Sequence, residues 1–142
     1  MKVSAKIDYA CRALLELSIH WPNENPMHID QIETSQKIPI KFLTQILIIL
    51  KHIGYVKNTR GKKGGYLLAI SPKEIKLSEV IQGFDKRAFS VLELTSDKQD
   101  DSYMDSVWRD IGKSLLAKCE KIDFEKIVDQ KRSVDNTMMF QI

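Results

Sequence analysis

The chain has 142 residues, 43% of them hydrophobic, and a formal net charge of +3, which suits one packed domain or one small domain with an appendage. No apolar run approaches the ~20 residues that cross a bilayer, and the residues after Met1 lack the features of a signal peptide, so we expect neither membrane insertion nor secretion. The two lone cysteines, Cys11 and Cys119, argue against a disulfide framework and favour a reducing, cytoplasmic setting.

The first predicted helix runs from about Ala5 to His20, with Ser4 as its N-cap. Its buried side is expected to comprise the residues at helical spacing, which are Ile7, Ala10, Cys11, Leu14, Leu15, Leu17 and Ser18. Cys11 falls inside this stripe, which favours a buried structural thiol over a sensing one. A loop at 22–26 leads to a short second helix near Ile29 to Gln36.

The third predicted helix, from Ile40 to His52, has the strongest pattern in the chain. Its apolar side chains recur at spacings of three and four: Phe42, Leu43, Ile46, Leu47 and Leu50. Gly54 follows where a left-handed C-terminal cap is expected. Two short strands are then predicted, at Tyr55–Val56 and Tyr66–Ile70, and the residues between them form a turn.

Positive charge is concentrated around this helix and hairpin. Between Thr34 and Lys73 there is no Asp or Glu, but there are eight basic residues: Lys37, Lys41, Lys51, Lys57, Arg60, Lys62, Lys63 and Lys73. A local cationic patch beside a mixed surface is typical of a protein with a polyanionic partner. Two short helices followed by such a hairpin predict a winged helix-turn-helix that binds double-stranded DNA.

In that arrangement the start of the third helix enters a major groove and the hairpin turn reaches the phosphates of an adjacent minor groove. The residues expected to contact DNA are Lys41, Phe42, Thr44 and Gln45 on the helix, and Arg60, Gly61, Lys62, Lys63, Gly64, Gly65 and Tyr66 in the hairpin. Gln45 carries the amide that can read adenine bidentately. The three glycines are expected to allow positive φ and close approach of the backbone to a phosphate.

The second half of the chain is predicted to serve assembly. A short helix capped by Ser78 ends near Phe84, residues 85–101 form a linker, and a long helix runs from Ser102 to about Cys119. The apolar side of the long helix comprises Val107, Trp108, Ile111, Leu115 and Leu116. We expect Val107, Trp108, Ile111 and Leu115 to pack against their copies in a symmetric homodimer, and the alternative is packing on the chain's own winged domain.

The predicted fold is therefore mainly α with a small β-wing, divided into a winged helix-turn-helix domain (1–84), a linker (85–101) and a dimerisation helix with a C-terminal tail (102–142). Asp123 is expected to cap a last short helix, followed by a polar tail from Asp129. His20, His28 and His52 are scattered without a paired acid or nucleophile, so we expect no enzyme, no catalytic residue, no metal and no cofactor.

Several short motifs resemble those of the Rrf2 family of bacterial transcription regulators. They are Met1-Lys2-Val3-Ser4, Tyr9-Ala10 with Arg12-Ala13-Leu14, Phe42-Leu43 with Gln45, Gly54-Tyr55-Val56, Arg60-Gly61 and Gly64-Gly65-Tyr66-Leu67-Leu68. The resemblance covers about residues 1 to 85 closely and the long helix, with Trp108-Arg109, more loosely. It implies a dimeric winged-helix regulator, which we take to be a repressor, that binds a near-palindromic operator.

One departure from the family pattern concerns its cofactor. Cluster-binding members carry three cysteines before the long helix, whereas this chain has none between Asp85 and Trp108. Asp8 and His28 stand near positions that some members use as ligands, but without thiolates they make a poor iron–sulfur site. The resemblance is therefore strongest to the CymR branch, the cluster-free regulators of cysteine metabolism. The alternative is a redox- or iron–sulfur-sensing regulator with a non-standard ligand set drawn from Asp8, Cys11, His28 and Cys119.

In the CymR branch the partner is cysteine synthase, and the end of this chain is similar to the aromatic-then-isoleucine terminus found there. The resemblance implies that Phe140 and Ile142 contact that enzyme. A free α-carboxylate beside a branched apolar side chain can mimic an amino-acid substrate in a nest of backbone N–H groups. The alternative, that residues 138–142 pack on the dimer or fray, stays open.

Overall fold

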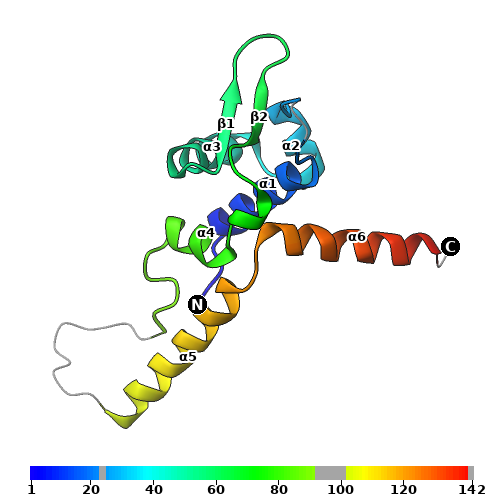
Figure 1. The fold of residues 1–142 in the computed structure, drawn as a ribbon. Helices are drawn as coiled ribbons and strands as arrows, with labels where there is room; N and C mark the ends of the chain where they lie inside the picture. Colours follow the sequence, from blue (N-terminus) through cyan, green and yellow to red (C-terminus); the bar gives the residue numbers. More distant parts are fainter. Residues whose placement is uncertain (23–24, 92–101, 141–142) are drawn as a thin grey trace.

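The computed structural model describes residues 1–22, 25–91 and 102–140. Its elements follow in the order α1 (Ala5–Ile19), α2 (Ile29–Gln36), α3 (Ile40–Ile53), β1 (Val56–Thr59), β2 (Gly65–Leu68), the 3-10 helix η1 (Pro72–Glu74), α4 (Leu77–Phe84), α5 (Tyr103–Glu120) and α6 (Phe124–Phe140). Figure 1 shows α1 to α4 and the hairpin gathered into one body, from which α5 and α6 extend in different directions. The prediction of a mainly helical fold with a small β-wing is confirmed.

Helix α1 is the central element, in contact with α2, α3, α4, α6 and β2. It begins where the Ser4 hydroxyl accepts a hydrogen bond from the Ile7 N–H at 3.2 Å, as an N-cap does. Ala10, Ala13 and Leu14 are fully buried along its length. The small side chains at two of these positions allow the neighbouring helices to approach closely.

Helices α2 and α3 form the helix-turn-helix. The His28 ring accepts the Asp30 N–H at 3.3 Å, and the Gln31 side chain accepts the His28 N–H at 3.0 Å, which caps the start of α2. Lys37 ends the helix in the left-handed conformation, with φ of 54°. Ile38 then turns into the core and is 1% exposed. This tight turn fixes α3 against α1 and α2.

The main hydrophobic core lies beneath α3. Helix α3 contributes Leu43, Ile46, Leu47 and Leu50, each at most 1% exposed. They pack in one cluster with Ala10, Ala13, Leu14 and Leu17 of α1, Ile32, Ile38, Val56, Leu68, and Phe124 of α6. Burial of about ten large apolar side chains, each contributing roughly 1.5–3 kcal/mol relative to exposure, is the main term that holds α3 in place.

The hairpin strands differ in length from those predicted. The prediction ended the first strand at Val56, but β1 continues to Thr59, and the pairs run from Val56 with Leu68 to Thr59 with Gly65. Only Val56 of β1 is buried, so hydrophobicity could not report the remainder of the strand. Met27 forms an isolated antiparallel bridge beside β2, since its N–H and C=O both bond the backbone of Tyr66 at 2.8 Å.

Helix α4 starts earlier than predicted, so the assignment of Ser78 as its N-cap is wrong. Lys76 occupies the N-cap position, and Ser78 is a buried residue inside the helix. The cause is tertiary: the Leu77 N–H bonds the Ile122 carbonyl at 2.8 Å, and Lys76 forms a bridge with Asp123. The α5–α6 connection therefore sets the start of α4.

The end of the chain also differs from the prediction of a short helix and a polar tail. Helix α6 runs without interruption to Phe140, and the Asp123 side chain caps it by accepting the Lys126 N–H at 2.9 Å. No Gly or Pro interrupts residues 124–140. The i,i+4 pair Lys131–Asp135, at 2.7 Å, supports the exposed part. None of the described helices is long and apolar enough to cross a membrane.

Candidate nucleic-acid interface

Helix α3 presents polar side chains to solvent on the side opposite the core. Lys41, Thr44 and Gln45 are exposed, whereas Leu43 and Ile46 beside them are buried. Residues three and four apart lie on one helical face, so the three polar residues line one side of α3, and we call them the α3 stripe. An ammonium, a hydroxyl and an amide are groups that bond base edges and phosphates.

The hydroxyl of Thr44 is partly committed within the helix. Its Oγ1 donates to the Ile40 carbonyl at 2.9 Å, an i−4 bond that threonine often makes in helices. Because the hydroxyl proton is used, Thr44 can only accept from a base or present its methyl group. Gln45 forms no such local bond among the described contacts and keeps both ends of its amide for an outside partner.

The spacing of the apolar residues predicted that Phe42 lies on the buried face of α3, and this prediction is wrong. Its side chain is 52% exposed and lies beside Tyr9 of α1, with ring centroids 6.0 Å apart. The core is already filled by Leu43 and Ile46, and a face centred on them turns position 42 toward the edge of the helix. This exposure agrees with its second predicted role, at the DNA surface, which stays a prediction.

The start of α1 borders the α3 stripe. The sequence did not predict this part of the site. A groove of about 400 Å³ lies between the two helices, and its lining residues are Ser4, Ala5, Lys6, Tyr9, Phe42, Gln45 and Ile46. Arg12 stands over the Tyr9 ring at 6.0 Å and pairs with Asp8 at 2.9 Å. The signal was available, because Lys6 and Tyr9 are three residues apart and belong to the less apolar side of the first predicted helix.

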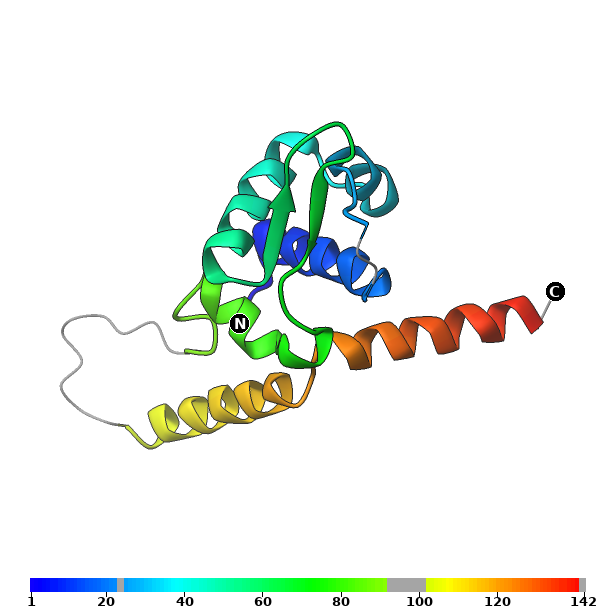
Figure 2. The ribbon, with the colours of Figure 1, turned by 45° about the horizontal axis from the view of Figure 1, so that its top comes forward.

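The hairpin tip carries three exposed cations. Arg60, Lys62 and Lys63 are all exposed at the end of the hairpin. Strand β1 contacts α3, and Figure 2 shows the hairpin beside that helix. Residues 34–73 hold no Asp or Glu, so no acid within this span offsets the positive charge. Such a surface attracts a polyanion over about one Debye length.

The hairpin requires glycine at positions 61, 64 and 65 for two different structural reasons. Gly61 has φ of 109°, which only glycine adopts readily, so the predicted need for positive φ holds there. For Gly64 and Gly65 that prediction is wrong. A Cβ at Gly64 would collide with the Thr59 carbonyl oxygen, and one at Gly65 with the Met27 carbonyl oxygen. These two glycines allow close packing of the hairpin backbone.

Tyr66 has a structural role in the wing. Its side chain is half-buried and packs against the main core, while its backbone pairs with Met27. The residue therefore anchors the base of the hairpin to the helical body. Its predicted contact with DNA is a separate matter and stays a prediction.

Helix α5 buries one side and exposes another. Asp105, Gly112 and Cys119 face the chain's own body, where an added Cβ at Gly112 would lie 2.5 Å from the Phe89 carbonyl oxygen. Among the predicted dimerisation residues, Trp108 is 40% and Ile111 45% exposed, and Val107 and Leu115 are half-buried. One face of α5 therefore packs on the chain's own body, as the alternative prediction had it. Beside that face, Met104, Trp108 and Ile111 form an exposed apolar strip.

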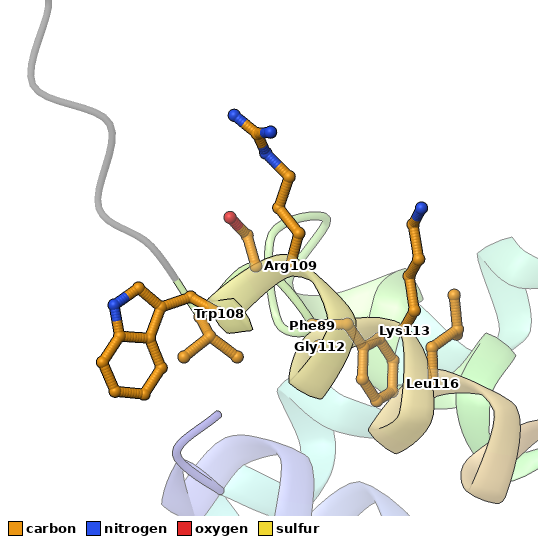
Figure 3. A pocket seen from close by; sticks show the side chains of 8 residues that line it. Phe89, Trp108, Arg109, Gly112, Lys113 and Leu116 are labelled. Atoms are coloured by element: carbon orange, nitrogen blue, oxygen red, sulfur yellow. The ribbon is translucent and has the colours of Figure 1, made fainter. Parts of the chain in front are cut away.

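A second cavity, of about 190 Å³, lies between α5 and residues 89–91 (Figure 3). Its lining residues are Phe89, Ser90, Val91, Trp108, Arg109, Gly112, Lys113 and Leu116. Figure 3 shows Arg109 and Lys113 on the same side of α5, with their charged ends pointing away from the body. This lining holds aromatic, aliphatic and cationic groups but no thiol, imidazole or carboxylate.

The residues considered as sensing groups are engaged elsewhere. Asp8 pairs with Arg12, and His28 caps α2. Burial, with a smaller contribution from the Asp8 carboxylate, raises the pKa of the Cys11 thiol to about 12. Burial also raises the pKa of Cys119, against a smaller lowering effect of Lys118. Both cysteines are therefore protonated thiols at neutral pH, the form that is poor in nucleophilic reaction and metal binding.

Comparison with known proteins places this geometry among transcription regulators. The Rrf2 family model, described as an iron-dependent transcriptional regulator, matches residues 3–130. An HTH-type transcriptional regulator of Synechocystis is 29% identical over 135 residues, which cover 94% of this chain and 91% of that protein. The structure of T. potens IscR has 31% identity and a TM-score of 0.77 over 92% of this chain and 88% of that one. The structure of CymR, the global cysteine regulator of B. subtilis, has 23% identity and a TM-score of 0.81 over 92% and 98%.

The donor groups described here do not fit the iron that the family description names. Within residues 1–22, 25–91 and 102–140, no three His, Cys, Asp or Glu side chains come together where they could hold a metal ion. The two thiols are buried and protonated, and the cavity beside α5 offers cations where an iron site needs anionic or neutral donors. Ile142 and the side chain of Phe140, the residues predicted to contact a partner enzyme, lie outside the described part of the structure.

Proposed function

This chain belongs to the Rrf2 family of transcriptional regulators, and on that premise we propose that it is a sequence-specific repressor that binds its operator as a homodimer in the cytoplasm. One observation carries the proposal above all. The α3 stripe and the cations at the hairpin tip are exposed on adjoining elements, within a span that holds no acidic residue. The family and the similar structures are transcription regulators, not enzymes.

In this proposal the two parts of the interface divide the work. Lys41, Thr44 and Gln45 enter a major groove, where Gln45 bonds adenine through both atoms of its amide. Arg60, Lys62 and Lys63 bond phosphates across the adjacent minor groove, so they set affinity and position without reading sequence. The groove between α1 and α3 is expected to receive the sugar-phosphate backbone beside Lys6 and Tyr9.

The salt dependence of DNA binding tests the wing. Replacing Lys62 and Lys63 together with Ala should weaken binding to every duplex and reduce the slope of log Kd against log salt by about two, since each phosphate contact contributes about 0.9. The matched control replaces Lys118 and Lys121, two exposed lysines on α5 and its end, and should leave the slope unchanged. Equal slopes for all three proteins would place the wing outside the interface.

Sequence preference tests the helix. Replacing Gln45 with Ala should relax the choice of one base pair by about 1–3 kcal/mol while leaving non-specific affinity nearly unchanged. Binding-site selection from a random duplex library, run in parallel on both proteins, measures this. Identical selected sequences would show that Gln45 does not read a base.

We further propose that the regulated genes serve cysteine or sulfur metabolism and that cysteine synthase acts as co-sensor. The similar fold of the B. subtilis cysteine regulator supports this, as does a donor set unsuited to a cluster. Deleting Ile142 should abolish binding to cysteine synthase, measured by calorimetry, and leave operator binding intact. An unchanged affinity for the enzyme would refute the docking of the terminus, and enrichment of unrelated promoters among bound genomic fragments would refute the assigned regulon.

A further inference from the structure

Ile48 is the most exposed of the large apolar side chains on α3, where Ile40, Phe42 and Ile53 are also exposed. Ile48 is 61% exposed, whereas Ile46, Leu47 and Leu50 on the same helix are at most 1% exposed. A side chain of this size would stabilise the fold if it were buried, and at this position that stabilisation is lost. Isolated exposed apolar residues are common on protein surfaces, so the position of Ile48 decides what it means.

Ile48 continues the α3 stripe along the helix. It follows Lys41 by seven residues, Thr44 by four and Gln45 by three, so all four side chains lie on one face. It stands one turn beyond Gln45, which is ~4.5 Å along the axis and comparable to the rise of one base pair. The side chain is β-branched and therefore stiff, so it presents a fixed apolar surface at that point.

The surroundings exclude a purely internal role for this side chain. The described core cluster contains its neighbours on α3 but not Ile48. Helix α5, with its exposed Trp108 and Ile111, leaves the body at the end opposite the wing tip (Figure 1). A phosphate would gain nothing from an isoleucine. In a major groove, the one apolar group on a base edge is the 5-methyl of thymine.

We propose that Ile48 is a specificity-determining residue that contacts a thymine 5-methyl group in the major groove, about one or two base pairs beyond the base read by Gln45. This inference rests on the proposed function, because it requires α3 to lie in the groove. It makes the readout of α3 partly apolar: Gln45 selects by hydrogen bonds, and Ile48 selects by covering a methyl group.

Uracil substitution isolates that methyl group. An operator is first selected from a random duplex library with the unaltered protein, and each dT is then replaced singly by dU, which removes only the 5-methyl. The unaltered protein should lose about fourfold in affinity at one or two thymines, the effect of one buried methyl. Ile48→Ala should bind the original operator about as weakly as the unaltered protein binds the dU form, and should be insensitive to dU at those positions.

Two controls separate the outcomes. Val134→Ala removes an equally exposed apolar side chain from α6 and should retain full sensitivity to dU. Because Ile48 is exposed, Ile48→Ala should unfold at the temperature of the unaltered protein. Two results would overturn the inference about Ile48 but leave the proposed function standing. One is tight, salt-dependent operator binding with no effect of dU, and the other is an Ile48→Ala protein as sensitive to dU as the original. Failure to select any sequence would overturn the proposed function with it.

Discussion

At the scale of single residues, Gly65 shows how a backbone contact dictates a side chain. The residue begins β2, opposite the carbonyl of Met27, and the bridge from Met27 to Tyr66 lies next to it. Any Cβ at this position would meet the Met27 carbonyl and part the two segments. The glycine is therefore required by packing, and the bridge between Met27 and Tyr66 depends on it.

Replacing Gly65 with Ala should lower the free energy of unfolding by about 1–3 kcal/mol, the cost of losing hydrogen bonds and packing at the base of the wing. Thermal and urea unfolding measure this loss. The matched control is Gly83→Ala in α4, where the added Cβ meets only the flexible end of Ile53. That variant should be neutral or gain up to about 1 kcal/mol from helix propensity. An undisturbed Gly65→Ala protein would refute the bridge to Met27.

Cys11 should make the protein less stable at alkaline pH. Its pKa is raised to about 12 in the folded chain, mainly by burial, and is near 9 when unfolded. The stabilisation from keeping the thiol neutral is thus complete below pH 9 and is lost as pH rises toward 12. The stability difference between the original protein and Cys11→Ala should narrow by about 1–2 kcal/mol from pH 8 to pH 10, measured by urea unfolding.

The same burial predicts slow chemistry at Cys11. Its reaction with a maleimide at pH 7.5 should be at least about a hundredfold slower than that of a free cysteine, because almost none of the side chain is thiolate. Mass spectrometry after timed quenching follows the modification. Fast labelling of Cys11 in the folded protein would favour the redox-sensing alternative over a structural thiol.

At the scale of elements, sequence patterns were most accurate where burial is one-sided. The bounds of α2 and the start of α3 follow from Ile29, Ile32 and the apolar period of the recognition helix, and they agree with the structure. The predicted start of α4 failed because a distant backbone, at Ile122, pairs with Leu77. A local sequence pattern cannot predict a hydrogen bond between residues that are so far apart in the chain.

The DNA interface was also predictable only where local sequence patterns report on it. Charge and glycine spacing located the wing, but the groove beside α1 depends on how Tyr9 and Phe42 meet, which the sequence does not contain in any local window. The outer half of α6 was missed because its residues are polar on nearly all sides. Helix propensity, the weaker signal, was the only one that applied there.

Helix α6 should behave as two parts. Phe124 and Val128 are buried in the body, and the Arg132 guanidinium donates to the Ile19 carbonyl at 3.2 Å, whereas residues 133–139 are exposed. Asn136→Pro should therefore reduce helical circular dichroism by several residues while shifting the melting temperature little, because the broken turns contact nothing in the body. Asn136→Ala is the control and should retain full helicity. A large drop in melting temperature would mean that the outer half of α6 is packed in solution.

At the scale of the whole molecule, the proposed function requires a second copy of the chain. One protomer offers one α3 and one wing, and a pair related by a two-fold axis would offer two, spaced to match a near-palindromic operator. The exposed side of α5 is the best-supported place for that axis. Ile111 is 45% exposed there, and Trp108, 40% exposed, stands at the edge of the cavity beside Phe89, while Gly112 holds the helix against the body.

Replacing Ile111 with Glu should therefore convert the dimer to a monomer, because a carboxylate would be buried at the centre of an apolar contact. Sedimentation measures the mass, and titration with duplexes carrying two half-sites or one measures the consequence for DNA. Loss of the dimer should lower affinity for the two-site operator at least about a hundredfold, since the second half-site no longer binds intramolecularly, and leave affinity for a single half-site unchanged. Ala117→Glu, on the far and exposed side of α5, is the matched control and should remain dimeric. If the Ile111→Glu protein kept the mass and operator affinity of the original, the two-fold axis would have to lie on another surface.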